Sequence, residues 1–148
     1  MPGWKLRIVG EGEERTALER LIRELRANDY VELCGAMNSG EVEHEMCTAG
    51  VYAMTSSSEG FSYVVLEAQS CYLPSVAFDV RVGPPFLITD GSDGFVVPDD
   101  DDAAFACRLE QLMRDDELRR TMGSAARVRS LDFSKEKIAR LWYEILGD

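Results

Sequence analysis

The chain has 148 residues, of which 45% are hydrophobic and 29% are charged, and its formal net charge is −11. This composition is typical of one soluble globular domain with a sizeable core. The acidic balance argues against nucleic-acid binding, because a phosphate backbone recruits a basic surface. No apolar run is long enough to span a membrane, and no cationic leader precedes an apolar segment, so neither a membrane helix nor a signal peptide is expected.

Strands and helices are predicted to alternate along the chain. Strands are expected at 5–9, 30–34, 51–54, 73–78 and 95–97, and helices at 14–27, 39–48, from Phe61 onward, and at 103–114, 117–129 and 134–146. Ser39 is expected to cap its helix, and Gly83-Pro-Pro85 to form a rigid loop. The alternation predicts an α/β fold, a Rossmann-like parallel sheet with helices on both faces. Such sheets bind ligands beyond the carboxyl ends of their strands.

The most informative segment runs from Glu59 to Glu67, with the sequence EGFSYVVLE. A loop rich in serine and glycine breaks off at Phe61 into an apolar run that is predicted to start a buried helix. A helix start offers free backbone N–H groups and a positive dipole end, which suit a phosphate. Glu67, expected to be buried two turns further in, can accept hydrogen bonds from a pair of hydroxyls. The pattern alone fits equally well an ordinary loop followed by a solvated glutamate.

Other motifs give weaker signals. The four cysteines, Cys34, Cys47, Cys71 and Cys107, match no metal-binding spacing and are expected to be buried, reduced thiols. The single histidine, His44, is expected on a partly exposed helix face. The sequence contains no nucleophile elbow, so a hydrolase that uses a Ser-His or Cys-His pair is not expected. The acidic run at 99–102 precedes a helix, where aspartate is favoured as a cap.

These residues together resemble a known family. The segments that carry the resemblance are Ser58 to Ala68, Leu73 to Asp79, Gly83-Pro84, Asp90-Gly91, Gly94 to Pro98, Val9 to Gly12, Val31 to Gly35 and Phe133 to Trp142. They look like the carboxyl-terminal half of a retaining glycosyltransferase of family 4, also called group 1. Members have two Rossmann-like domains facing a cleft, the GT-B architecture. The carboxyl-terminal domain binds a nucleotide sugar, and the amino-terminal domain mainly holds the acceptor.

The resemblance assigns roles to individual residues. Glu59 would be the catalytic residue, facing the transferred sugar and stabilising the developing positive charge. Glu67 would hold the ribose hydroxyls. The donor would also contact the segment Gly60, Phe61, Ser62, Tyr63 and Val64, mainly through backbone amides, and its base would lie near the rim formed by Leu33 and Met37. The resemblance implies no metal and no cofactor beyond the nucleotide sugar itself, with a UDP-hexose or UDP-N-acetylhexosamine favoured.

The chain departs from the family pattern in three ways. The acceptor domain is missing, and so are the first strand and helix of the donor domain, which supply the family's basic pair for the diphosphate. Ser62 stands where a glycine is usual, and Tyr72 replaces a usual glycine before Leu73-Pro74. A positive φ would strain Tyr72, so a locally different turn is the favoured interpretation. Alone, residues 1–148 are expected to bind donor weakly and to transfer nothing measurable.

The leading hypothesis is therefore the donor-binding half of a glycosyltransferase that acts in glycan or polysaccharide synthesis. An alternative is a non-catalytic subunit that binds nucleotide sugar and works with a separate acceptor-domain protein. A related epimerase or phosphorylase is disfavoured, because no histidine-rich acid/base set or Schiff-base lysine motif is present. Arg81 is a further candidate for the sugar or phosphate, although an exposed loop arginine fits equally well. A cytoplasmic location is expected, with any membrane association supplied by the missing half.

Overall fold

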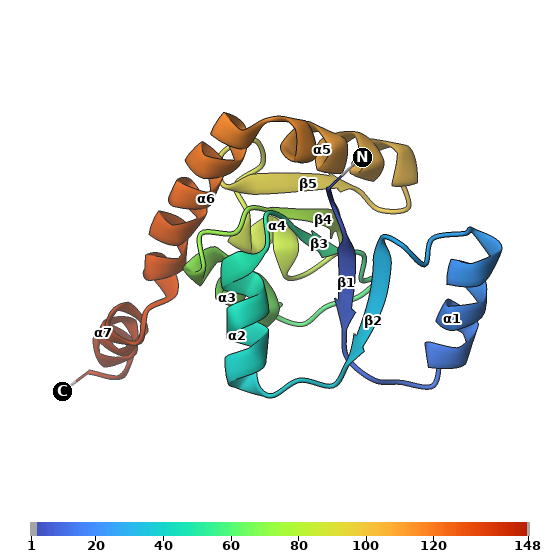
Figure 1. Cartoon of the computed structure of the whole chain (residues 1–148). Coiled ribbons are helices and arrows are strands. Elements are labelled where there is room, and N and C mark those ends of the chain that lie inside the picture. The colour runs from blue at the N-terminus through green and yellow to red at the C-terminus, as the bar shows by residue number, and fades with distance from the viewer. Residues whose placement is uncertain (1–2, 148) are drawn as a thin grey trace. The chain divides into compact units, whose positions relative to one another are not determined.

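The computed structural model describes residues 3–147. The chain divides into two compact units, Met1–His44 and Glu45–Asp148. Within the described residues, every strand pairing inside a sheet is parallel, as the sequence predicts. The pairings form a two-stranded sheet, β1-β2, in the first unit and a three-stranded sheet, β3-β4-β5, in the second. Figure 1 labels these elements in chain order.

The first unit contains β1 (Leu6–Val9), α1 (Arg15–Glu24) and β2 (Val31–Gly35). β1 and β2 are in register from Leu6, opposite Val31, to Ile8, opposite Leu33. The predicted amphipathic helix is present, and it is shorter at both ends than the predicted range 14–27.

Helix α2 (Ser39–Thr48) has the predicted bounds, but its cap differs from the prediction. Asn38, not Ser39, supplies the cap, because its Oδ1 accepts hydrogen bonds from the amides of Gly40 and Glu41, at 3.0 and 3.1 Å. The Glu41 carboxylate in turn accepts a hydrogen bond from the amide of Asn38 at 2.8 Å. The two side chains thus form a reciprocal capping box, which satisfies amides that the helix itself leaves free.

The second unit holds most of the core. Its elements are β3 (Tyr52–Met54), α3 (Tyr63–Ser70), β4 (Ser75–Asp79), α4 (Pro84–Leu87), β5 (Gly94–Pro98), α5 (Asp102–Arg114), α6 (Asp116–Ser130), the 3-10 turn η1 (Leu131–Phe133) and α7 (Lys135–Leu146). The loop predicted at Gly83-Pro-Pro85 begins a short helix, since proline is well suited to a first helical turn. Asp101 caps α5 as predicted, accepting from the Ala104 amide at 2.9 Å.

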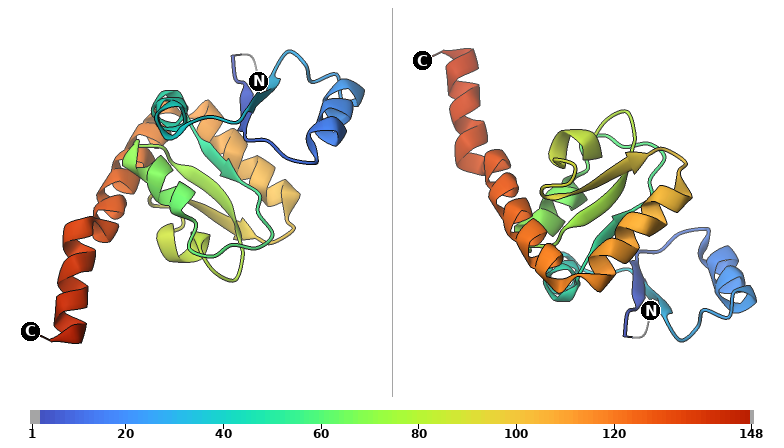
Figure 2. Two further views of the ribbon diagram at one scale, coloured as in Figure 1. Left: turned by 90° about the horizontal axis from the view of Figure 1, so that it is seen from below. Right: turned by 90° about the horizontal axis from the view of Figure 1, so that it is seen from above.

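The central strand β4 separates two apolar layers. Val76 and Phe78 face one layer, which includes Phe105 of α5 and Met122 of α6. Ala77 faces the other, with Val65 of α3 and with Leu87 and Ile88 in and after α4. Because successive side chains on a strand point to opposite faces, one strand serves both layers. The helices therefore cover both faces of this sheet, as the views in Figure 2 show.

Helix α7 differs from the other helices of this unit. It runs out from the end of α6, away from the sheet (Figure 2), and none of its residues is buried. Over the described range 3–147, no helix combines the length and the apolar character needed to cross a membrane.

Candidate functional site

Two loops leave the same edge of the second sheet. β3 pairs in parallel with β4, from Tyr52 opposite Ser75 to Met54 opposite Ala77. The loop after β3 carries Glu59, and the loop after β4 ends at Gly83. Since the carboxyl ends of parallel strands meet at one edge, this is the position at which α/β sheets bind ligands.

The first loop ends in a tight turn at Ser62. Ser62 has a φ of 59°, in the left-handed region, where a residue other than glycine costs about 1 kcal/mol or more. The Ser62 side chain is buried, and its hydroxyl donates a hydrogen bond to Glu59 Oε2 at 3.2 Å. This bond orients the carboxylate. The helix begins at Tyr63, two residues later than predicted, because the left-handed turn cannot be part of a right-handed helix.

Gly83 lies directly against this turn. A Cβ atom at Gly83 would lie 2.4 Å from the Ser62 hydroxyl oxygen and 3.2 Å from Glu59 Cβ, and the residue has a φ of 104°. Both the space and the backbone conformation therefore require glycine. The close approach joins the loop after β3 to the loop after β4 at the residue that positions Glu59.

Phe61 anchors the same turn through aromatic contacts. Its ring centroid lies 5.1 Å from that of Tyr63, 6.2 Å from that of Phe86 and 5.8 Å from that of Phe133. Tyr63 and Phe86 are mostly exposed, whereas Phe61 is half-buried. The cluster fixes the start of α3 while leaving aromatic surface beside it.

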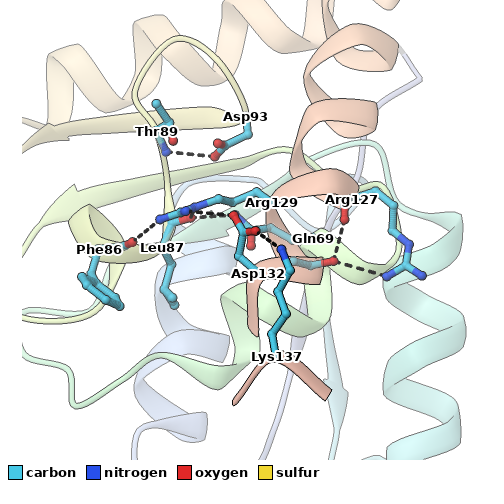
Figure 3. Close-up of polar contacts among 10 residues, drawn as sticks. Gln69, Phe86, Leu87, Thr89, Asp93, Arg127, Arg129, Asp132 and Lys137 are labelled. Carbon is cyan, nitrogen blue, oxygen red and sulfur yellow. Dashed lines mark hydrogen bonds and ion pairs between the residues drawn. The ribbon is translucent and has the colours of Figure 1, made fainter. Parts of the chain in front are cut away.

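Helix α4, which follows Gly83, is held in place by side chains from two other helices. Figure 3 shows Arg129 of α6 reaching the carbonyl oxygens of Phe86 and Leu87, to which it donates hydrogen bonds of 2.9 and 3.4 Å. The side-chain Nε2 of Gln69, on α3, also donates a hydrogen bond to the Leu87 carbonyl oxygen, at 3.0 Å. Asp132 accepts a hydrogen bond from the Arg129 guanidinium at 3.2 Å. These bonds give the second loop a rigid support.

The amino-terminal end of α3 carries free backbone amides. The amides of Tyr63 and Val64 have no hydrogen-bond acceptor among residues 3–147, since the first intrahelical positions have none to use. Free amides at a helix start and the positive end of its dipole form a favourable seat for a phosphate.

Glu67 is exposed, which corrects the expectation of a buried carboxylate. Val65, Ala68 and Gln69 are the buried residues of α3. They share one face of the helix, and Glu67 falls on the opposite side. An exposed carboxylate needs no protein partner, so Glu67 is available to a ligand.

Tyr52 is affected by the negative charges of both Glu59 and Glu67. It lies half-buried on β3, and burial raises the pKa of its phenol to about 12, with further contributions from the negative charges of Glu59 and Glu67. Both carboxylates are therefore within electrostatic reach of one hydroxyl, although they belong to a loop and a helix. Sequence reasoning missed Tyr52, whose only signal is a polar tip in an otherwise apolar strand.

We expect the phenol of Tyr52 to ionise at about pH 12, above the ordinary value of 10. The chemical shift of its ring carbon bonded to oxygen, followed by NMR against pH, measures this directly. Glu59→Gln and Glu67→Gln should each lower the pKa, by less than burial raises it. Because the pKa is raised in the folded state, its contribution to stability is present below pH 10 and is lost as the pH rises through 12. If neither variant changed the pKa of Tyr52, both carboxylates would be too far from its hydroxyl to affect it.

The structure also describes the surroundings of the remaining predicted site residues. Gly60 is exposed in the turn after Glu59. Leu33, on β2, and Met37, in the loop that follows, are both half-buried and belong to the first unit. Arg81 is exposed in its loop. Tyr72 has a φ of 59°, so the turn there does require a left-handed residue, and the alternative of a locally different turn was wrong.

The four thiols are less buried than the sequence predicted. Cys47 and Cys107 are exposed and Cys34 and Cys71 are half-buried, and none forms a disulfide. His44 is exposed on α2, in line with the prediction of a partly exposed helix residue. Among residues 3–147, no three histidine, cysteine or acidic side chains are grouped so that they could hold a metal ion.

Comparison with known proteins identifies the family. The model of the glycosyl transferases group 1 matches residues 1–129. The chain belongs to this family. It is 37% identical, over 145 residues, to the amylovoran biosynthesis glycosyltransferase AmsD of Erwinia amylovora, and the match covers 98% of this chain and 40% of that protein. The group 1 chain thus spans about two fifths of this relative's length.

Solved glycosyltransferase structures of GT-B architecture show the same fold. A Staphylococcus aureus TarM variant, in complex with fondaparinux, alpha-GlcNAc-glycerol and UDP, matches with a TM-score of 0.89 and 26% identity, over 97% of this chain and 29% of that one. The pneumococcal O-GlcNAc transferase GtfA, in complex with UDP and GlcNAc, matches with a TM-score of 0.83 and 28% identity, over 97% of this chain and 30% of GtfA. The group 1 domain here therefore corresponds to about a third of each of these larger proteins.

Proposed function

We propose that this chain is the donor-binding half of a retaining glycosyltransferase that moves a hexose or N-acetylhexosamine from a UDP-sugar to an acceptor in polysaccharide or glycan synthesis. The observation that carries the proposal is the start of α3, where backbone amides are free, Ser62 holds Glu59 next to them, and Glu67 is exposed further along the same helix. UDP in the TarM and GtfA structures supports the choice of nucleotide.

In this proposal each part of the site meets one part of the donor. The exposed Glu67 accepts hydrogen bonds from the two ribose hydroxyls. The diphosphate lies at the start of α3, where the amides of Tyr63 and Val64 and the helix dipole stabilise negative charge as the diphosphate departs. No metal ion is assigned to this step.

Glu59 faces the transferred sugar. The Ser62 hydroxyl holds one carboxylate oxygen at 3.2 Å, and the other is left for the hydroxyls of the sugar. Positive charge develops on the sugar ring as its bond to the diphosphate breaks, and a fixed carboxylate stabilises that charge more than it stabilises the neutral ground state. Gly83 contributes by allowing Ser62 and Glu59 to approach the second loop.

The rest of the enzyme lies outside these residues. An acceptor domain, in the same polypeptide or in a separate protein, supplies the second substrate. A preceding strand and helix with a basic pair complete the diphosphate site. The net charge of −11 repels a diphosphate, so without that basic pair we expect the affinity of this chain for UDP to be weak, in the millimolar range.

Binding of nucleotides to this chain tests the proposal. Ligand-detected NMR with UDP, GDP, ADP and UDP-sugars should show selective binding of the uridine nucleotides. Glu67→Ala should weaken that binding by about tenfold or more, because hydrogen bonds to a charged group are lost. Since Glu67 is exposed, the free energy of unfolding should change by less than about 0.5 kcal/mol.

Glu117→Ala provides the matched control, as it removes an exposed glutamate from α6. It should leave nucleotide binding unchanged. If Glu67→Ala bound UDP as well as the unmodified chain, or lost binding only because it unfolded, the proposed role of Glu67 would be wrong.

A further inference from the structure

Two cysteines far apart in the sequence lie together in the second unit. Cys47 is in the last turn of α2, and Cys71 is the residue that directly follows α3. They are separated by 24 positions, yet their sulfur atoms are 2.7 Å apart, with the Cys47 thiol donating to the Cys71 sulfur. A disulfide has a sulfur–sulfur distance of about 2.05 Å. The two sulfurs therefore need to approach by only a fraction of an ångström to form one.

Access and backbone support favour reaction at this pair. Cys47 is exposed, so an oxidant in solution can reach its sulfur, and Cys71 is half-buried behind it. The Cys71 amide is held by the carbonyl oxygens of Glu67 and Ala68, at 3.3 and 3.0 Å. The second thiol is therefore fixed in position before the first one reacts.

We propose that Cys47 and Cys71 form a reversible disulfide that closes the segment carrying the candidate site. This segment, residues 48–70, contains β3, the loop with Glu59, and α3 with Glu67. The bond would tie the end of α3 to α2. Its formation is independent of the function proposed above, since it requires only the two thiols and an oxidant.

The oxidant is a low-molecular-weight disulfide such as oxidised glutathione. The Cys47 thiolate attacks one of its sulfurs, which forms a mixed disulfide and releases one glutathione thiolate. The Cys71 thiolate then attacks the Cys47 sulfur, which forms the protein disulfide and releases the second glutathione. Two protein thiols are oxidised and one glutathione disulfide is reduced to two thiols, and the two protons lost by the protein are taken up by the two glutathione thiolates.

The test is equilibration of the whole chain in glutathione buffers of increasing oxidising strength. Peptide mapping by mass spectrometry should find a Cys47–Cys71 crosslink, at oxidant ratios at which Cys107 and Cys34 are still reduced, because the paired thiols react intramolecularly. In Cys71→Ser, a glutathione adduct should accumulate on Cys47 instead. The oxidised chain should melt about 5 °C or more above the reduced chain, since the crosslink restricts the unfolded state.

Cys107→Ser is the matched control, because it removes an exposed cysteine from α5. It should keep the crosslink and the melting shift, whereas Cys47→Ser should lose both. A result that contradicts the proposal can be obtained with the unmodified chain, without any variant. Glutathione adducts that accumulate equally on Cys47 and Cys107, with no crosslinked peptide, would show that the two thiols do not act as a pair.

Discussion

Replacing Glu59 by glutamine should lower turnover by about a hundredfold to a thousandfold in a polypeptide that joins this domain to its acceptor domain, while donor affinity changes by less than about threefold. Glutamine keeps the shape of the side chain and an oxygen that can still accept from the Ser62 hydroxyl. Only the negative charge is lost. That charge acts on the positive sugar ring of the transition state, so steady-state kinetics and donor binding should respond differently.

Glu67→Gln provides the contrasting variant. It removes the charge that holds the ribose, which is bound in the ground state and in the transition state alike, so it should raise KM with a smaller effect on kcat. Equal losses of turnover and donor affinity in Glu59→Gln would contradict the role of Glu59 as the residue that stabilises the transition state. Its role would then be simple binding.

The largest effect on stability is expected from Gly123→Ala in α6. A Cβ atom at this position would lie 2.1 Å from the backbone carbonyl oxygen of Tyr72, which no side-chain rotation can relieve. Either α6 or the turn before β4 must move. We expect a loss of about 3 kcal/mol in the free energy of unfolding and a fall of about 10 °C in Tm, measured by thermal and urea unfolding.

Gly40→Ala is the matched control for this substitution. Gly40 is also helical, in α2, and its nearest neighbour would lie at an ordinary contact distance of 3.4 Å. Alanine there should be neutral or stabilising by up to about 1 kcal/mol, because alanine favours helix. Equal stabilities for Gly123→Ala and the unmodified chain would show that α6 does not pack against Tyr72 as closely as the structure indicates.

The sequence predicted the regular elements well, because hydrophobic periodicity determines them. Val76 and Phe78 alternate with Ala77 along β4, and each set faces its own apolar layer. Asp101 caps α5 because its carboxylate accepts a hydrogen bond from a free amide of the first turn, an interaction between residues close in sequence. The α/β class and the strand ends that form the site edge follow from the same patterns.

The finer geometry of the candidate site could not be predicted in the same way. The left-handed turn at Ser62 depends on a tertiary contact with Gly83, which lies 21 positions later. The exposure of Glu67 depends on the phase of α3, and that phase is set by where the turn ends and the helix begins. The short helix α4 depends on Arg129, which holds its carbonyl groups from a distant part of the chain.

The backbone conformation of Tyr72 could not be predicted from the sequence either. A positive φ at this position follows from how the end of α3 meets Leu73, whose amide bonds to the Ala68 carbonyl at 3.1 Å, and from the close packing of Gly123 against the Tyr72 carbonyl. Sequence patterns carry no signal for such a contact. The chain tolerates the strain of a left-handed tyrosine because the surrounding structure fixes this turn.

A crystal structure of this chain with UDP tests the central claim most directly. The proposed function predicts both ribose hydroxyls within hydrogen-bonding distance of the Glu67 carboxylate and the diphosphate beside the amides that begin α3. UDP bound elsewhere on the chain, with Glu67 and the start of α3 free of ligand, would contradict it.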